Sequence, residues 1–386
     1  MNAYGLIQYL QQHIAPRKMG SKRQIVRIAK INDYRQIFRT INQAKKSNKL
    51  LKQIQFLPFI RAIAFPGTSL ALPLTRWIEK VSVEEDLLLN IHPPGGGMHS
   101  KIRPPQPFVP EGMRQIRIPE VRKYAAGNGV KIGVIDTGAD FHHPDLQSVL
   151  AHGVNFVYPS LMPIDDNGHG THIAGTIAAT GNHAMKGIAP AATLYPVKAF
   201  DQHGSAYVSD IIRGIEWCVQ HRMDVINMSF GMRERSDAMR AAVRKATQAG
   251  IILIASAGND GLHGKVDYPA RYAETISVGA TNRQGCVAAF SNSGANIDIL
   301  APGERIMSTW PQRRYHVMNG TSMATAHVTG VIALILSVKP HYTPFQLKRL
   351  IMMSRKPLRC KYRKKPTSGR LDALQLFRKL RLIHRR

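Results

Sequence analysis

The sequence predicts an α/β protein in which helices cover both faces of a mostly parallel sheet, a doubly wound three-layer fold, with a small α+β domain before it. Between residues 130 and 338, short β-rich apolar runs alternate with helical segments, as in a parallel sheet. Before them, a segment rich in Pro and Gly follows an earlier, smaller set of strands and helices. The chain has 386 residues, 44% of them hydrophobic, enough for both cores.

The first expected domain covers residues 21–90. Strand-like runs and an amphipathic helix occur in it, as in a small α+β domain. The expected elements are a strand at 23–33, a helix at 34–46, apolar segments within 51–65, a short helix at 72–79 and a strand at 81–86.

Residues 1–20 form a leader without signal-peptide features. Polar side chains interrupt its apolar residues at Gln11, Gln12, His13 and Arg17. We therefore expect a cytoplasmic protein, with export by a non-classical route as the alternative.

Residues 91–108 are expected to be a linker, because Pro and Gly disfavour both helix and strand there. The second domain covers residues 109–386, including a basic C-terminal end. Its expected strands are 130–136, 193–199, 224–228, 251–255 and 275–280, and its expected helices begin at His169, Ala206, Ser236 and Ser322.

The net charge of +29 lies on the two flanks of the chain. Lys and Arg outnumber acids by 19 to 6 in residues 1–119 and by 15 to 1 in residues 341–386, but only by 19 to 17 between them. Basic flanks can bind polyanions. No recognition motif or stacking aromatics accompany them, so we expect no specific nucleic-acid partner.

Cysteine content and hydropathy exclude two further classes. Cys218, Cys286 and Cys360 are odd in number and widely spaced, so we interpret them as buried or free thiols rather than a disulfide framework or metal site. No uninterrupted apolar stretch approaches the ~20 residues of a membrane span, so we expect none.

Polar residues follow two of the expected strands. Asp136 ends one strand, and Asn259 lies shortly after another. Functional residues of parallel sheets gather at the carboxyl ends of strands. The alternative for Asp136, which is followed by Thr-Gly, is a turn-capping role.

His169 and His172 lie near a helix start, three residues apart. A zinc site is the alternative to a catalytic role, but the Glu of a His-Glu-x-x-His motif and a third ligand are absent. Ser322 begins a long apolar helix, where the helix dipole favours negative charge. Its alternative is an ordinary N-cap.

Together these residues supply the chemistry of acyl transfer. A serine needs a base, most often His, and the imidazole needs a buried carboxylate to orient it. The developing oxyanion needs donors, for which the Asn259 amide and the Ser322 backbone N–H are candidates.

The second domain resembles the subtilisin-like serine proteases over roughly residues 108–377. The order Asp, His, Ser along the chain is that of subtilisin. The resemblance rests on VIDTGADFHHPDL (134–146), GHGTHIAGTIAA (168–179), VINMSFG (225–231), ASAGN (255–259), FSNSGANIDILAPG (290–303) and GTSMATAHVTG (320–330).

This resemblance implies a subtilisin-like fold and a serine endopeptidase acting on peptide or protein substrates through an acyl-enzyme. Asp136 would orient His169, the general base and acid, for attack by Ser322, with Asn259 in the oxyanion hole. The rivals are a pseudoprotease that only binds, and a polyanion-binding protein of protease ancestry.

The resemblance also implies a zymogen. Residues 21–90 would be a ferredoxin-like α+β pro-domain, which assists folding and inhibits the enzyme, and self-processing would cut the chain within 91–108. Thr343-Pro344 and residues 369–373 match the family's closing helices, so the basic C-terminal end would belong mostly to the catalytic domain.

The resemblance further assigns walls that bind an extended peptide by strand addition. Asp267 aligns with the base of the pocket for the residue before the cut bond, where a carboxylate would favour Lys or Arg. Its alternative is a carboxylate that faces solvent or a neighbouring side chain. The wall residues are Ser229, Phe230, Gly231, Ala255, Ser256, Ala257 and Gly258.

Two positions depart from the family pattern. Ala326 stands where the family usually has Pro, a change expected to cost rigidity more than chemistry. Asp145 and Asn182 match structural calcium ligands, but the loop at 180–186 is shortened and contains a Lys. A bound calcium therefore stays open, and no organic cofactor is expected.

Overall fold

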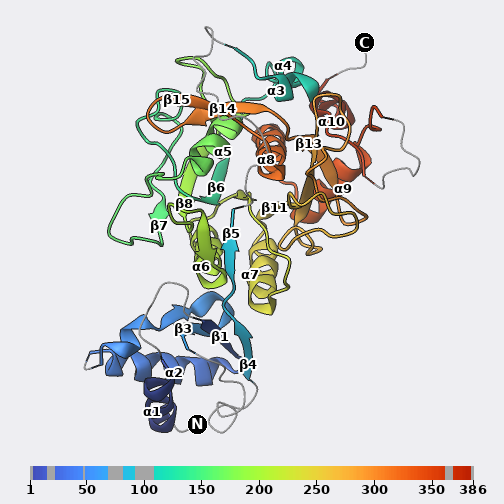
Figure 1. The fold of residues 1–386 in the computed structure, drawn as a ribbon. Coiled ribbons are helices and arrows are strands. Elements are labelled where there is room, and N and C mark those ends of the chain that lie inside the picture. Colours follow the sequence, from blue (N-terminus) through green and yellow to red (C-terminus); the bar gives the residue numbers. More distant parts are fainter. Residues whose placement is uncertain are drawn as a thin grey trace. The chain divides into compact units, whose positions relative to one another are not determined.

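The chain forms two compact units in the computed structural model (Figure 1). The first unit comprises residues 1–88, 207–216 and 236–245, and the second comprises the remainder. The predicted helix at 72–79 and almost all of the predicted linker lie outside the described residues. The structure describes residues 3–14, 22–46, 48–67, 81–91, 108–360 and 368–383.

The first unit contains a four-stranded antiparallel sheet in the order β2-β3-β1-β4. The predicted strand at 23–33 is too long, because the helix that follows it already begins at Ile31 and buries Tyr34, Ile37 and Ile41 at helical spacing. The elements are α1 (Ala3–His13), β1 (Arg23–Ile28), α2 (Ile31–Ala44), β2 (Gln55–Leu57), β3 (Ala62–Pro66) and β4 (Val81–Glu85), with 3₁₀ helices at Leu50–Gln53 and Pro58–Ile60.

Two carboxylates at the end of β4 cap helices within the first unit. Glu84 accepts hydrogen bonds from the Ser236 hydroxyl (2.5 Å) and the Ala238 N–H (3.1 Å), at the start of α7 (Asp237–Gln248). Asp86 accepts from the backbone N–H and the hydroxyl of Ser209, at 2.8 and 2.7 Å, in the first turn of α6 (Val208–Gln220). Carboxylates are favourable at these positions because helix N-termini present free N–H groups and positive charge.

Burial raises the pKa of the Asp86 carboxyl to about 6. The Arg23 charge, 2.9 Å away, and the Ser209 hydrogen bonds oppose this rise. Arg23 also lies over the Tyr207 ring, 4.3 Å from its centroid. The ion pair is therefore enclosed, and loss of either partner would leave a buried charge.

The second unit is built on a seven-stranded parallel sheet in the order β13-β12-β11-β10-β6-β8-β7. The chain adds β7 and β8 on one side of β6 and the later strands on the other, so its direction reverses at β6. The predicted α/β fold is confirmed. The strands are β6 (Lys131–Asp136), β7 (Val154–Asn155), β8 (Thr193–Lys198), β10 (Val225–Met228), β11 (Ile252–Ser256), β12 (Ile276–Thr281) and β13 (Ile299–Pro302).

Helix α8 (Thr321–Val338) packs on β10 to β13 and against α5 (His169–Ala178), as Figure 1 shows. By length and its mean hydropathy of 1.6 it could cross a membrane, but 89% of it is buried inside the protein. Its apolar surface is therefore covered by protein, as in the core helix of a globular domain. On β6, a methyl group added at Gly133 would lie 2.5 Å from the Cys218 sulfur, so the end of α6 packs closely there.

Several short elements were not anticipated from the sequence. An antiparallel hairpin of β14 (Ile306–Trp310) and β15 (Arg314–Met318) packs on α5 through its first strand. The others are β5 (Leu88–Asn90), β9 (Ser205–Tyr207), α3 (Glu111–Gln115) and α4 (Ile118–Val121). Helices α9 (Pro344–Met353) and α10 (Ala373–Lys379), in contrast, begin where the family resemblance places closing helices.

The prediction that all three cysteines are thiols is wrong for two of them. Cys286 and Cys360 form a disulfide across 74 residues of sequence, with Cα atoms 5.5 Å apart, whereas Cys218 is free and buried. Sequence spacing could not reveal this pair, because it is brought together by the return of the chain from α9 to the sheet edge at Leu300 and Arg370.

Candidate active site

Polar residues gather where three neighbouring strands end. β6 ends at Asp136, Ser229 follows β10, and Asn259 lies three residues after β11. Because these strands are adjacent and parallel, their carboxyl ends lie at one edge of the sheet, close to the reversal at β6. Such an edge is the usual ligand site of an open α/β sheet.

Asp136 and His169 form a buried pair. His169 is the first residue of α5, and its Nδ1 lies 2.8 Å from Asp136 Oδ1. Both residues are almost fully buried, since 2% of His169 and 1% of Asp136 are exposed. Since the carboxylate accepts, Nδ1 carries the proton, which leaves Nε2 as an acceptor. Nε2 is buried and has no hydrogen-bond partner among the described residues.

Ser322 is the second residue of α8, and only 1% of it is exposed. Its hydroxyl donates to the Ser229 carbonyl at 2.9 Å, and its own carbonyl accepts from the Ser229 hydroxyl at 3.2 Å. The N-terminal turns of α5 and α8 thus present His169 and Ser322 from two packed helices.

The Asn259 side chain has a fixed orientation. Its Oδ1 accepts from the backbone N–H and the hydroxyl of Thr321, at 2.9 and 2.8 Å. Its Nδ2 therefore points the other way, is buried without a partner in the described part of the chain, and would lie 3.2 Å from a methyl group added at Gly320. A free donor thus lies beside the residues that precede Ser322.

Asp165 was not identified from the sequence, although it organises the start of α5. Its two oxygens accept from the Thr137 hydroxyl (2.8 Å), the Gly168 N–H (2.8 Å) and the N–H and hydroxyl of Thr171 (2.8 and 2.6 Å). Asp165 therefore links Thr137, which follows Asp136, to the turn that precedes His169. An acidic residue just before a helix start was the signal that could have revealed it.

His172 is held differently from His169. Its Nε2 bonds to the carbonyls of Ile306 and His316, at 3.0 and 3.1 Å. Burial, with the His169 charge as a smaller cause, lowers the pKa of His172 to about 3, so it stays neutral. The His169 ring bonds to Asp136, whereas the His172 ring bonds to backbone carbonyls, so the two histidines do not face a common metal site. No group of three or more potential metal ligands occurs in the described residues.

A profile of the Subtilase family matches residues 127–375. This chain belongs to the subtilase family. It is 47% identical to Subtilisin E of Bacillus subtilis (strain 168), over 62% of this chain and 64% of that protein. It is 46% identical to Subtilisin of Bacillus pumilus and 43% identical to Subtilisin Savinase of Lederbergia lenta, over 62% of this chain and 89% and 88% of those proteins. The match thus spans less than two thirds of Subtilisin E, and the predicted resemblance to subtilisin-like serine proteases is confirmed.

These relatives contradict the predicted cytoplasmic location, because they are secreted, extracellular subtilisins. The prediction rested only on the polar residues that interrupt the leader. The Cys286–Cys360 disulfide of this subtilase also points away from the cytoplasm, since structural disulfides persist in oxidising compartments.

The predicted substrate-wall residues of this subtilase are buried, so few of their side-chain atoms reach the surface. The Phe230 ring is fully buried and packs against Phe200, with centroids 5.0 Å apart, so only its backbone can face a peptide. Gly258 has a φ of 106°, which favours glycine. The other wall residues, Ser229, Gly231, Ala255, Ser256 and Ala257, are all buried at the ends of β10 and β11.

Asp267 does not face solvent. Only 4% of it is exposed, and a methyl group added at Gly258 would lie 2.6 Å from its Oδ2. Its carboxylate therefore lies directly behind the wall that precedes Asn259. Of the two alternatives to a specificity role, the solvent-facing one does not match this position.

The two predicted calcium ligands of this subtilase lie in different settings. Asp145 accepts from the N–H groups of His183 (2.7 Å), Ala184 (3.2 Å) and Met185 (3.0 Å), and from the Tyr315 hydroxyl (2.6 Å). Burial acts to raise the pKa of Asp145, but these donors together hold it below its usual range. Asn182 is exposed. Because four hydrogens point at the carboxylate, the donor set does not fit a calcium ion, which requires oxygen ligands.

We expect the segment around Asp145 to be stable without calcium, because three amides and the Tyr315 hydroxyl already satisfy this carboxylate. Excess EDTA should therefore leave the melting temperature of the Ser322→Ala chain nearly unchanged. Tyr315→Phe should destabilise it by about 1.5–3 kcal/mol, the usual loss for a hydrogen bond to a charged group. A large drop in melting temperature with EDTA, reversed by calcium, would contradict this expectation.

Proposed function

We propose that this subtilase is a serine endopeptidase that hydrolyses peptide bonds through an acyl-enzyme. The buried Asp136–His169 pair carries the proposal, because it leaves His169 Nε2 as an acceptor without a partner in the described residues. Ser322 lies at the N-terminus of the helix packed on the one that carries His169. These are the parts that a serine needs to become a nucleophile.

In the proposed reaction, His169 Nε2 takes the Ser322 proton as Oγ attacks the substrate carbonyl carbon. The Asp136 carboxylate stabilises the imidazolium, which then gives its proton to the leaving amine. In the second half, His169 takes a proton from a water molecule as it attacks the acyl carbon, the bond to Ser322 Oγ breaks, and Oγ regains its proton as the carboxylic acid leaves. Because Ser322 Oγ donates to the Ser229 carbonyl in the structure, the hydroxyl must first turn toward His169.

Asn259 Nδ2 and the Ser322 backbone N–H would receive the oxyanion. The Thr321 bonds hold the Asn259 amide in place before substrate binds, so little reorganisation is needed when charge develops. Gly320 leaves room beside Nδ2, since any side chain there would approach it.

Replacing Asn259 with Ala should therefore lower kcat by about 10²–10³-fold, a magnitude known from subtilisin itself, with little change in KM. Steady-state kinetics on a peptide amide would measure both constants. Asn182→Ala is the control, because Asn182 is an exposed asparagine outside the site. An unchanged kcat in Asn259→Ala would exclude the assigned role.

The substrate is proposed to be an extended peptide bound by strand addition along the residues after β10 and β11. Asp267 lies behind Gly258 at the end of this wall. We infer that its carboxylate favours Lys or Arg before the cut bond, because a buried anion attracts a cationic side chain more strongly than an apolar one.

Asp267→Asn should lower kcat/KM for Arg-containing peptide amides by about tenfold or more, the loss expected for a charged hydrogen bond. The value for matched Phe-containing amides should change little. If the unmodified enzyme cleaves both amides equally well, Asp267 binds a neighbouring group instead.

We also propose that residues 21–90 act as the pro-domain and that self-cleavage falls within 91–108. The capping of α6 and α7 by Asp86 and Glu84 supports this, because it attaches β4 to helices whose sequences lie within the predicted catalytic domain. Such an attachment would hold the segment that follows β4 until it is cut.

A serine-directed fluorophosphonate probe tests the proposed activity. The processed chain should be labelled, and Ser322→Ala should not. Labelling also separates an enzyme from a pseudoprotease or a polyanion-binding protein. Failure of folded, processed protein to react would overturn the proposal.

A further inference from the structure

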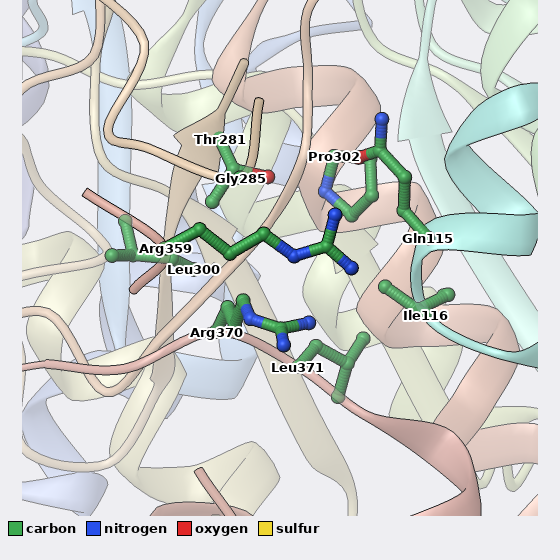
Figure 2. A pocket seen from close by; sticks show the side chains of 9 residues that line it. All are labelled: Gln115, Ile116, Thr281, Gly285, Leu300, Pro302, Arg359, Arg370 and Leu371. Atoms are coloured by element: carbon green, nitrogen blue, oxygen red, sulfur yellow. The ribbon is translucent and has the colours of Figure 1, made fainter. Parts of the chain in front are cut away.

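A small cationic pocket lies in the second unit, between the end of α3, the sheet edge at β12 and β13, and the C-terminal segment (Figure 2). It is partly open to solvent, and the space within its walls is about 10 Å³, roughly the room that one water molecule needs. Its lining residues are Gln115, Ile116, Thr281, Gly285, Leu300, Pro302, Arg359, Arg370 and Leu371.

Two guanidinium groups dominate this pocket. Figure 2 shows Arg359 and Arg370 extended side by side with their charged ends in it. Arg370 Nε donates to the Pro357 carbonyl at 3.1 Å. No side-chain hydrogen bond or ion pair of Arg359 occurs in the described residues, and no carboxylate lines the pocket. Most of the guanidinium donors are therefore available to a ligand.

The two charges repel each other. Burial lowers the pKa of Arg370, and the Arg359 charge lowers it further, against the opposing effect of Asp372. Asp372 is the one acidic residue in residues 341–386, and it already caps Gln375 (2.9 Å) and pairs with Lys356 (3.0 Å). A bound anion would relieve this repulsion.

The fold holds both arginines in place. The Cys286–Cys360 disulfide joins the residues next to Gly285 and Arg359, and the Arg359 N–H donates to the Gly285 carbonyl at 3.2 Å. Because Gly285 has no side chain, the Arg359 stem can lie against its backbone, 3.0 Å from where a Cβ would stand. Arg370 exchanges backbone hydrogen bonds with Lys356, at 2.9 and 2.8 Å. These contacts fix the backbone of both arginines, although the Arg359 side chain is exposed to solvent, and a fixed backbone reduces the entropy that binding costs.

We propose that this pocket binds a small phosphate-type oxyanion, which stabilises the folded protein. Planar guanidinium groups pair with the oxygens of such anions through two parallel hydrogen bonds each. Because the pocket itself has room for little more than a water molecule, the anion would lie at its open mouth, between the two guanidinium groups. Binding to the folded state alone raises its stability according to ligand concentration.

The test uses the full chain carrying Ser322→Ala, so that binding is measured without proteolysis. Inorganic phosphate is titrated by calorimetry, and melting temperature is compared in sodium phosphate and in sodium chloride of equal ionic strength. Phosphate should bind and raise the melting temperature above that in chloride. Arg359→Gln should weaken binding by about tenfold or more, as expected for charged hydrogen bonds.

Arg349→Gln is the matched control, because it removes the same charge from an exposed position on α9 outside the pocket. Arg359→Lys, which keeps the charge but loses the planar fork, should also weaken binding. Glycerol phosphate distinguishes a site for phosphate esters, which it would occupy, from one for the free ion, and binding of either anion supports the proposal. Equal effects of phosphate and chloride, or equal losses in Arg349→Gln and Arg359→Gln, would overturn it.

Discussion

Ser322→Ala is expected to lower kcat by about 10⁶-fold, the loss found when the nucleophile of subtilisin is removed. The reason is that no other group in the site can form the acyl-enzyme. Ser322 is buried, and its hydroxyl donates one hydrogen bond, to the Ser229 carbonyl. Ser322→Ala removes that bond but keeps the one from the Ser229 hydroxyl to the residue 322 carbonyl, so the fold should stay intact. Activity on a peptide amide and a melting curve measure the two effects.

The same variant should stay uncut between residues 90 and 109 if processing is autocatalytic. Ser337→Ala is the control, since it removes a serine hydroxyl from the far end of the same helix, where its one bond among the described residues goes to the Leu334 carbonyl. The control should be processed and active. Normal cleavage of purified Ser322→Ala would show that another protease makes the cut.

Asp136→Asn is expected to lower kcat by about 10⁴-fold with little change in KM. Asp136 Oδ1 now accepts the Nδ1 proton of His169 at 2.8 Å and leaves Nε2 free. An amide nitrogen facing Nδ1 would instead favour the tautomer protonated at Nε2, which cannot act as a base. The same change also removes the charge that stabilises the imidazolium.

Asp224→Asn provides a control for this substitution. Asp224, just before β10, accepts from the Lys131 N–H at 2.8 Å at the opposite end of β6, so it tests the loss of a carboxylate that contacts the same strand without touching the site. It should retain nearly full activity. A loss of only a few-fold in Asp136→Asn would mean that His169 keeps its tautomer without the carboxylate.

Much of the second unit could be predicted from local patterns. Apolar runs bounded by turn residues indicated β6, β8, β10, β11 and β12, because a strand buried on both faces needs a continuous apolar sequence. β7, with two residues, and the β14–β15 hairpin carry too little pattern to be recognised. Helix starts were correct to within two residues at His169, Ala206, Ser236 and Ser322.

The sequence also named every residue to which we assign a catalytic step. Nucleophile, base, orienting acid and amide donor differ in residue type, and each stands in a motif at the end of a strand or the start of a helix. Local motifs did not reveal the residues that hold the catalytic side chains in place. Asp165 accepts hydrogen bonds from both Thr137 and Thr171, and the sequence around Asp165 does not indicate that it reaches Thr137, 28 positions away.

The sequence by itself determined the fold class, the family and the candidate catalytic residues. Only the tertiary structure decided that Cys286 pairs with Cys360, that amides and Tyr315 surround Asp145, and that Arg359 and Arg370 share a pocket. The physical reason is the range of the interactions. Periodicity and residue type report what a segment needs locally, whereas most of these contacts join residues far apart in the sequence and depend on where the sheet and its crossovers carry the chain.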